Sequence, residues 1–202
     1  DGCATFRASG ATEPGEASTA LGSTIVLKLL SDRPIFAPEL GIYSHRIGDT
    51  WLAGGASNCG GKTLLQFFSQ AQLASLESSL DTSKPTGTDY YPLPSVGERF
   101  PVSDPHLAPR LTPRPADDAQ FLQGIYEAFA RVEQTGFAKL TALGGPTLRN
   151  VRHAGGGCRS AAWMSLRASA LGMPQLPAWS EEAAAGAARL AWRSLGHEIA
   201  FT

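Results

Sequence analysis

The sequence predicts a single α/β domain over residues 1–202, with a mixed sheet flanked by helices. Two observations predict this fold class. Short β-favouring runs joined by glycine turns occupy the amino-terminal part, and strands alternate with helical segments in the carboxy-terminal part. Glycine turns between adjacent runs favour antiparallel hairpins, whereas strand–helix alternation favours parallel pairing. Both kinds of pairing are therefore expected in one sheet.

Composition limits the functions that need consideration. The chain has 202 residues, 17 basic and 18 acidic side chains, and no apolar run long enough to cross a membrane. This near-balance of charge provides no electrostatic surface for nucleic acid or for an anionic membrane. Cys3, Cys59 and Cys158 lack metal-ligand spacing and predict reduced thiols in a cytoplasmic protein.

The amino-terminal elements are a helix and a hairpin. Residues 1–10 are expected to form a short helix, and residues 18–21 and 24–29 two strands. The dipeptide Gly22-Ser23 separates these strands, and glycine at the first central position favours a type II′ turn. Because the chain opens at Asp1 without a methionine or a signal peptide, we expect it to be part of a longer protein.

The remaining elements follow from apolar periodicity and from the positions of glycine and proline. Residues 117–143 are the longest expected helix, with a buried stripe formed by Phe121, Ile125, Phe129, Val132 and Leu140. Residues 100–115 carry five prolines and are expected to be an extended surface loop. The other expected elements are strands at 41–46, 50–53, 89–94 and 150–154, an edge strand at 172–177, and helices at 63–69, 69–80, 161–171 and 181–195.

The hairpin tip at Gly22, Ser23 and Thr24 is a candidate phosphate-binding element. It combines backbone amides with two hydroxyl groups and no side chain at Gly22. Amides and hydroxyls are the groups that phosphate oxygens accept hydrogen bonds from. A plain reversal of the chain is the alternative interpretation of the same residues.

A second glycine turn, H-A-G-G-G-C-R-S-A-A-W at residues 153–163, is more specific. A strand, three glycines and a helix let the backbone approach a ligand and direct helix amides at it. Ser160 is positioned to hydrogen-bond a base edge, and the face of Trp163 to cover an adenine. A tight strand-to-helix connection with Trp163 in the core is the alternative.

Residues 56–63, A-S-N-C-G-G-K-T, satisfy the loose pattern of a phosphate-binding loop ending in Lys62 and Thr63. No later apolar strand ends in an aspartate that would hold magnesium, and the preceding strands resemble hairpins. A glycine-lined turn with an exposed Lys62 is the favoured interpretation. A phosphate-loop NTPase remains as an alternative.

Asp1 is a candidate general base that would take a proton from a hydroxyl nucleophile. An ordinary helix cap is the alternative role for this carboxylate. The sequence by itself does not decide between the two.

The order of these motifs resembles a known family. Asp-Gly-Cys, then Leu-Gly-Ser-Thr, then Ala-Gly-Gly-Gly-Cys-Arg-Ser-Ala-Ala-Trp is similar to the C-terminal half of the FGGY carbohydrate kinases. These are two-domain members of the actin-like ATPase group, whose domains have a ribonuclease H-like fold. The resemblance covers essentially the whole chain. The segments Y-Y-P-L-P, G-E-R-F-P-V and L-T-P-R-P resemble the D-ribulose kinase branch, which is also described as xylulose kinase-like.

The resemblance implies a role for each matching residue. Asp1 matches the aspartate that deprotonates the sugar hydroxyl. The remaining matches concern the nucleotide: Gly22, Ser23 and Thr24 at its phosphates, Gly55 near a second phosphate-approach turn, and Gly156, Gly157, Ser160 and Trp163 at adenosine. Cys158 stands where alanine is usual, and Ser160 where many members have asparagine.

The expected function is therefore ATP-dependent phosphorylation of a small sugar, a ketopentose such as D-ribulose or D-xylulose. ATP and Mg²⁺ are the implied cofactors, and the metal would be held mainly by water and by an amino-terminal domain. The expected partners are the sugar and that amino-terminal domain, with a homodimer left open. The competing hypotheses are the phosphate-loop NTPase and a non-catalytic interaction domain that uses residues 101–115 or the long helix.

Overall fold

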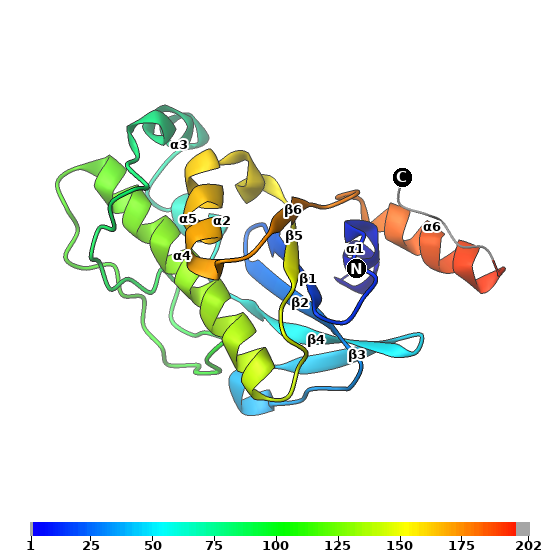
Figure 1. The fold of residues 1–202 in the computed structure, drawn as a ribbon. Coiled ribbons are helices and arrows are strands. Elements are labelled where there is room, and N and C mark those ends of the chain that lie inside the picture. Colours follow the sequence, from blue (N-terminus) through cyan, green and yellow to red (C-terminus); the bar gives the residue numbers. More distant parts are fainter. Residues whose placement is uncertain (1, 197–202) are drawn as a thin grey trace.

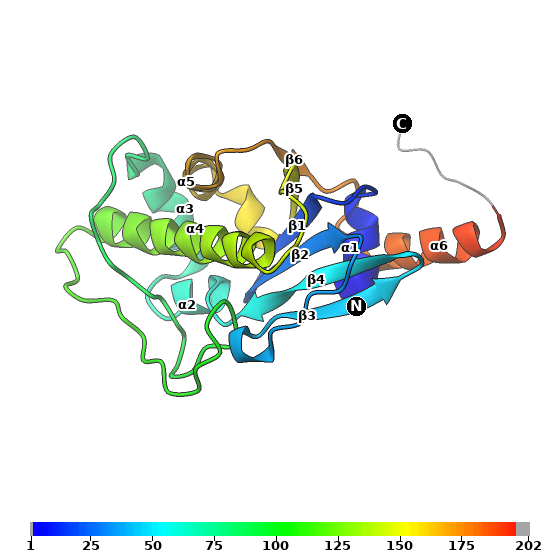
Figure 2. The same ribbon diagram turned by 60° about the horizontal axis from the view of Figure 1, so that its bottom comes forward.

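The computed structural model describes residues 2–196, which form one six-stranded sheet with helices on both faces (Figures 1 and 2). The strand order is β3-β4-β2-β1-β5-β6. The strands are β1 (Glu16–Leu21), β2 (Ile25–Ser31), β3 (Tyr43–Ile47), β4 (Thr50–Ser57), β5 (Asn150–Ala154) and β6 (Gln175–Pro177). The helices are α1 (Gly2–Ser9), α2 (Gly61–Leu64), α3 (Gln70–Leu76), α4 (Asp118–Ala142), α5 (Ala161–Leu171) and α6 (Ala183–Ser194), with 3-10 turns η1 (Pro38–Leu40), η2 (Glu77–Ser79) and η3 (Gly156–Arg159).

The sheet is mixed, as the sequence predicts. The four amino-terminal strands pair antiparallel, whereas β5 pairs parallel with both β1 and β6. The long helix α4 crosses one face together with α5, and α1 lies on the opposite face, where α6 packs against it (Figures 1 and 2). The expected edge strand is confirmed, since β6 ends the sheet.

Successive side chains of β2 point to opposite faces of the sheet, and they contribute to two separate apolar layers. Ile25, Leu27 and Leu29 belong to the main core that contains the apolar stripe of α4. Leu30 lies in a smaller cluster beneath α1, together with Phe6. The predicted stripe of α4 is confirmed, because all five of its members are buried.

The structure corrects two local expectations. In the first hairpin Leu21 pairs with Ile25, so the loop has three residues, and Gly22 is not in the left-handed region that a type II′ turn requires. Residues 89–94 do not form a strand, because Pro92 and Pro94 supply no amide for a ladder. A single bridge between Tyr91 and Arg110 is all that remains there.

A third correction concerns Gly55, which the resemblance puts near a phosphate-approach turn. β4 continues through this residue to Ser57, and Gly55 pairs with Leu27 in the interior of the sheet. A Cβ atom at Gly55 would overlap the buried ring of Phe100. Gly55 therefore accommodates Phe100, which anchors the start of the proline-rich loop to the sheet.

Candidate functional site

The two glycine turns lie side by side because β1 and β5 are parallel neighbours. Ala20 pairs with Ala154, so both strands end at the same edge of the sheet. The hairpin tip follows β1 at this edge, and Gly155 to Gly157 follow β5. Ligands of open α/β sheets bind in a crevice outside the carboxyl ends of such strands. This juxtaposition agrees with the resemblance, which assigns both corners to one nucleotide.

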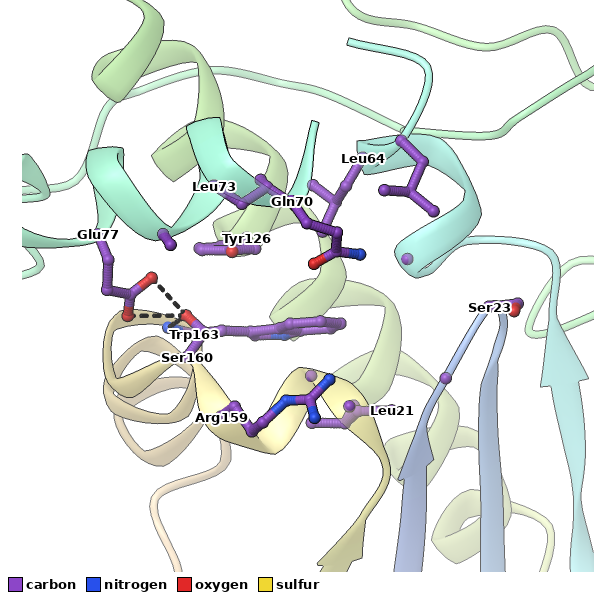
Figure 3. Close-up of a pocket in the computed structure, with 16 residues that line it drawn as sticks. Leu21, Ser23, Leu64, Gln70, Leu73, Glu77, Tyr126, Arg159, Ser160 and Trp163 are labelled. Carbon is purple, nitrogen blue, oxygen red and sulfur yellow. Dashed lines mark hydrogen bonds between the residues drawn. The ribbon is translucent and has the colours of Figure 1, made fainter. Parts of the chain in front are cut away.

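A cavity of about 590 Å³ opens between the two corners (Figure 3). This volume is in the range of small-molecule sites. Its walls come from the hairpin tip, α2, α3, η2, α4, η3 and the start of α5. The lining residues are Leu21, Gly22, Ser23, Gly61, Leu64, Leu65, Gln70, Leu73, Ala74, Glu77, Tyr126, Gly156, Gly157, Arg159, Ser160 and Trp163.

The hairpin tip presents unused hydrogen-bond donors. The amide of Gly22 donates to Thr24 O at 3.1 Å. The carbonyls of Gly22 and Ser23 accept hydrogen bonds from the amides of Gly61 and Lys62, respectively. Within residues 2–196 the amides of Ser23 and Thr24 have no acceptor. A Cβ atom on Gly22 would meet nothing closer than Thr24 O at 3.7 Å, so packing does not require glycine here. The tip therefore offers two free amides beside open space.

The corner after β5 requires glycine for packing. Gly155 has a φ of +99°, and a Cβ there would lie 2.7 Å from Leu21 O. A Cβ on Gly157 would overlap Trp163 and lie 2.8 Å from Leu21 Cβ. Gly156 is exposed, and a Cβ there would meet only the flexible side chain of Arg159. Gly156 is thus the position where this corner is open to a ligand.

Trp163 lies in the core, the alternative that the sequence left open. Its side chain is 2% exposed. One face stacks on Tyr126 with ring centroids 5.2 Å apart (Figure 3), the Phe129 ring centroid lies 5.0 Å away, and a Cβ atom on Gly157 would overlap the indole. An adenine stacked on the face of Trp163 is therefore excluded in this arrangement. The indole instead supports Tyr126 and Gly157, which both line the cavity.

Ser160 is occupied by two structural hydrogen bonds. Its hydroxyl caps α5 by accepting from Trp163 N at 3.0 Å, and it donates to the Glu77 carboxylate at 2.9 Å (Figure 3). Glu77 also accepts from Ala162 N at 2.8 Å. Glu77 thus joins η2 to α5 and closes one end of the cavity. Sequence reasoning missed Glu77, because a carboxylate at the end of a leucine-rich helix shows no binding pattern.

The phosphate-loop interpretation of residues 56–63 is wrong. The amides that would hold a phosphate are already engaged: Asn58 N donates to Glu98, Gly61 N to Gly22 O at 2.9 Å, and Lys62 N to Ser23 O at 3.2 Å. β4 is antiparallel to both of its neighbours, whereas a phosphate-loop fold needs a parallel crossover. Lys62 is exposed and does not line the cavity. Gly61 and Lys62 instead hold the hairpin tip in place through these main-chain hydrogen bonds.

Most of the predicted nucleotide residues meet at one place. Gly22, Ser23, Gly156, Gly157, Ser160 and Trp163 line the cavity, and Thr24 completes the tip beside it. Gly55 does not line it, and Asp1 lies outside the described residues. Gln70, Leu73 and Glu77 also line it, although no motif contained them. They come from segments whose approach depends on the tertiary fold.

Two wider features of the described chain bear on its function. No helix in residues 2–196 is both long and apolar enough to cross a membrane. Over the same residues, no group of three or more His, Cys, Asp or Glu side chains is placed to hold a metal ion.

Solved structures with the same fold include several sugar kinases. A xyloylose kinase from Brucella ovis is 25% identical, with a TM-score of 0.81 over 96% of this chain and 42% of that chain. A xylulose kinase from Rhodospirillum rubrum is 23% identical, with a TM-score of 0.80 over 99% of this chain and 42% of that chain. A glycerol kinase from Plasmodium falciparum, solved with ADP, is 16% identical, with a TM-score of 0.76 over 96% of this chain and 41% of that chain.

The present chain thus spans about two fifths of the length of these kinases. Their fold is that of the actin-like ATPases, and the six-stranded mixed sheet between helices shares it. Residues 17–195 match the sequence profile of the FGGY family of carbohydrate kinases, C-terminal domain. The chain therefore belongs to the FGGY family of carbohydrate kinases and corresponds to its C-terminal domain.

Proposed function

We propose that this chain is the ATP-binding half of a kinase that phosphorylates a small sugar. The observation that carries the proposal is the pair of glycine corners on one cavity, with the free amides of Ser23 and Thr24 at the adjoining hairpin tip. Family membership supports the same activity. Positioning and charge stabilisation supply most of the catalysis in phosphoryl transfer, and both are tasks of backbone amides.

The lining of the cavity supports one orientation for the proposed nucleotide. Adenosine would lie between the α3 wall and the Gly156 corner, where Leu73, Ala74 and Gly157 line the cavity. The phosphates would then extend to the hairpin tip and accept hydrogen bonds from Ser23 and Thr24. Ser160 would meet the ligand only as an acceptor, because its proton is donated to Glu77.

The substrate we propose is a ketopentose, D-ribulose or D-xylulose. This is supported by the sequence segments similar to the D-ribulose kinase branch and by the 25% identity with a xyloylose kinase. An amino-terminal domain would supply most sugar contacts. Mg²⁺, held by water and by that domain, would neutralise phosphate charge.

Asp1 is proposed as the general base. It would accept the proton of the attacking sugar hydroxyl, and an ordinary carboxylate suffices because that proton is released late in a loose transition state. Asp1→Ala in the protein with its amino-terminal domain should lower kcat by about 100-fold or more and leave the ATP dissociation constant nearly unchanged. The isolated chain should show little or no turnover. Wild-type turnover by the Asp1 variant would remove Asp1 from the mechanism.

Calorimetry with ATP–Mg tests the binding half of the proposal. Gly22→Val should weaken binding about tenfold or more, because the valine leaves the fold intact but fills the space beside the free amides. Lys62→Ala is the matched control and should bind like the wild type. No binding heat with the wild-type protein would favour the non-catalytic interaction domain.

A further inference from the structure

A carboxylate lies at the end of the cavity that is remote from the hairpin tip. Figure 3 shows Ser23 on one side of the cavity, and Glu77 with its hydrogen-bond partner Ser160 on the other. In the orientation proposed above, the phosphates reach the tip, so the base of the nucleotide lies at the Glu77 end. The polar groups at this end are therefore the ones that the edge of the base would meet.

The Glu77 carboxylate has acceptor capacity that the fold does not use. Its Oε1 accepts from Ala162 N at 2.8 Å and from Ser160 Oγ at 2.9 Å, so both lone pairs of this oxygen are engaged. Within residues 2–196 its Oε2 accepts only from Ser160 Oγ, at 3.0 Å. The half-buried Glu77 side chain lines the cavity, and its Oε2 keeps one free lone pair.

The two hydroxyl groups next to Glu77 are already committed. Ser160 gives its proton to Glu77 and accepts from Trp163 N. Tyr126, which is 3% exposed, lies near both Ser160 and Glu77. Burial and the Glu77 charge raise the pKa of the Tyr126 phenol, so this group keeps its proton. Among the cavity-lining residues of the described chain, Glu77 is the one carboxylate.

One free, charged acceptor matches adenine better than the other common purines. The 6-amino group of adenine is a hydrogen-bond donor, whereas the 6-oxo group of guanine or hypoxanthine is an acceptor. A 6-oxo group would bring an oxygen lone pair against the carboxylate. Paired recognition of the N1–H and 2-amino groups of guanine requires both carboxylate oxygens, and Oε1 of Glu77 is already engaged.

We propose that Glu77 selects the base of the nucleotide, because its Oε2 accepts a hydrogen bond from the 6-amino group of adenine. This inference deepens the proposed function and rests on it, since it concerns the base of the same nucleotide. Glu77 thus has a specificity role in addition to joining η2 to α5.

A series of nucleotides tests the inference without any substitution. Calorimetry of the protein with its amino-terminal domain would compare the Mg²⁺ complexes of ATP, ITP and purine riboside triphosphate, which carry an amino group, an oxygen and a hydrogen at position 6. ATP should bind about tenfold or more tightly than either analogue, because a hydrogen bond to a charged acceptor is lost in both. Equal affinities for ATP and purine riboside triphosphate would overturn the inference.

Glu77→Gln assigns the preference to one side chain. The glutamine Oε1 can still accept from Ser160 and Ala162, so the melting temperature should fall by a few degrees at most. Its amide nitrogen replaces Oε2 and is a donor, so ATP should bind about tenfold or more weakly and ITP at least as tightly as ATP. Glu39→Gln, an exposed carboxylate on η1 outside the cavity, is the matched control and should keep the wild-type preference.

A purely structural role for Glu77 would give a different result. Glu77→Gln would then weaken ATP, ITP and purine riboside triphosphate by the same factor, and this outcome would overturn the inference. Sugar phosphorylation by the same protein would leave the proposed function standing. A wild-type protein that binds none of the three nucleotides would overturn both.

Discussion

Glycine serves three different purposes at the residue scale in this domain. Gly22 leaves open space at the hairpin tip, Gly155 adopts a left-handed backbone, and Gly157 makes room for Trp163. Their positions could be predicted from the sequence, because glycine next to short polar residues marks a turn. Their purposes could not, because each depends on what packs against the turn in three dimensions. Gly55 shows the same limit, since its partner Phe100 is remote in sequence.

Gly157→Ala and Gly156→Ala should differ sharply. A Cβ at Gly157 overlaps the Trp163 ring, so this variant should have a lower melting temperature and bind ATP about tenfold or more weakly. At Gly156 the new Cβ would meet only Arg159 Nη2 at 3.3 Å, so the melting temperature should remain that of the wild type. Thermal denaturation and ATP titration of both variants check this. Equal melting temperatures for the two would contradict the packing argument.

At the scale of elements, α4 shows which buried residues apolar periodicity predicts and which it does not. The apolar stripe and the helix bounds follow from the sequence to within a residue or two. Its buried Glu133 does not, because a carboxylate in a helix is expected to face solvent. Glu133 is 1% exposed and forms a two-pronged ion pair with Arg167 of α5, with both N–O distances at 2.6 Å. It also accepts from Thr19 on β1. The pair thus joins three elements behind the cavity.

Glu133→Gln should destabilise the domain strongly. The change leaves the Arg167 charge buried without its anion, and the expected loss in unfolding free energy is about 3–5 kcal/mol. Urea denaturation measures it. The double variant Glu133→Met with Arg167→Met should recover much of the loss, since it removes both charges.

Asp32→Asn is the control for that comparison, because Asp32 and Arg33 form an exposed pair. Its denaturation midpoint should match the wild type. A Glu133→Gln midpoint that is equally unchanged would show that the buried pair does not hold β1, α4 and α5 together.

At the scale of the whole molecule, strand order was the least predictable property. Hairpin turns identify neighbours that are close in sequence, but the pairing of β1 with β5 depends on where α4 carries the chain. The sequence motifs contained the two glycine corners that line the cavity, and the resemblance implied that these corners meet. The walls from α3 and η2 could not be predicted, because half-exposed leucines and a glutamate carry no distinctive signal.

The described ends of the domain are joined by the contact of α1 with α6, and Gly186 sets how close they approach. A Cβ at this position would overlap the carbonyl oxygen of Ala4, and Arg189 Nη1 donates to Arg7 O at 2.8 Å nearby. Glycine to alanine normally stabilises a helix by about 1 kcal/mol. Here Gly186→Ala should instead lower the melting temperature, because α6 must move away from α1.

Ala187→Ser, on an exposed part of the same helix, provides the comparison in thermal denaturation. It should leave the melting temperature nearly unchanged. ATP affinity should be normal in both variants, because the cavity is built from other elements. A Gly186→Ala protein more stable than the wild type would show that the two helices do not touch as described.

The parallel seam between β1 and β5 has a consequence for the growing polypeptide. The hairpin tip can form once β1 and β2 have been synthesised. The glycine corner after β5 takes its place only after α4 has been synthesised and β5 has docked beside β1. A nascent or truncated chain ending before Asn150 would therefore not bind ATP, even with its hairpins fully formed. Once the corner after β5 is in place, a bound nucleotide would stabilise this state relative to earlier folding intermediates, because those intermediates lack the complete cavity. Nucleotide capture in this protein would thus mark the moment at which β5 docks beside β1.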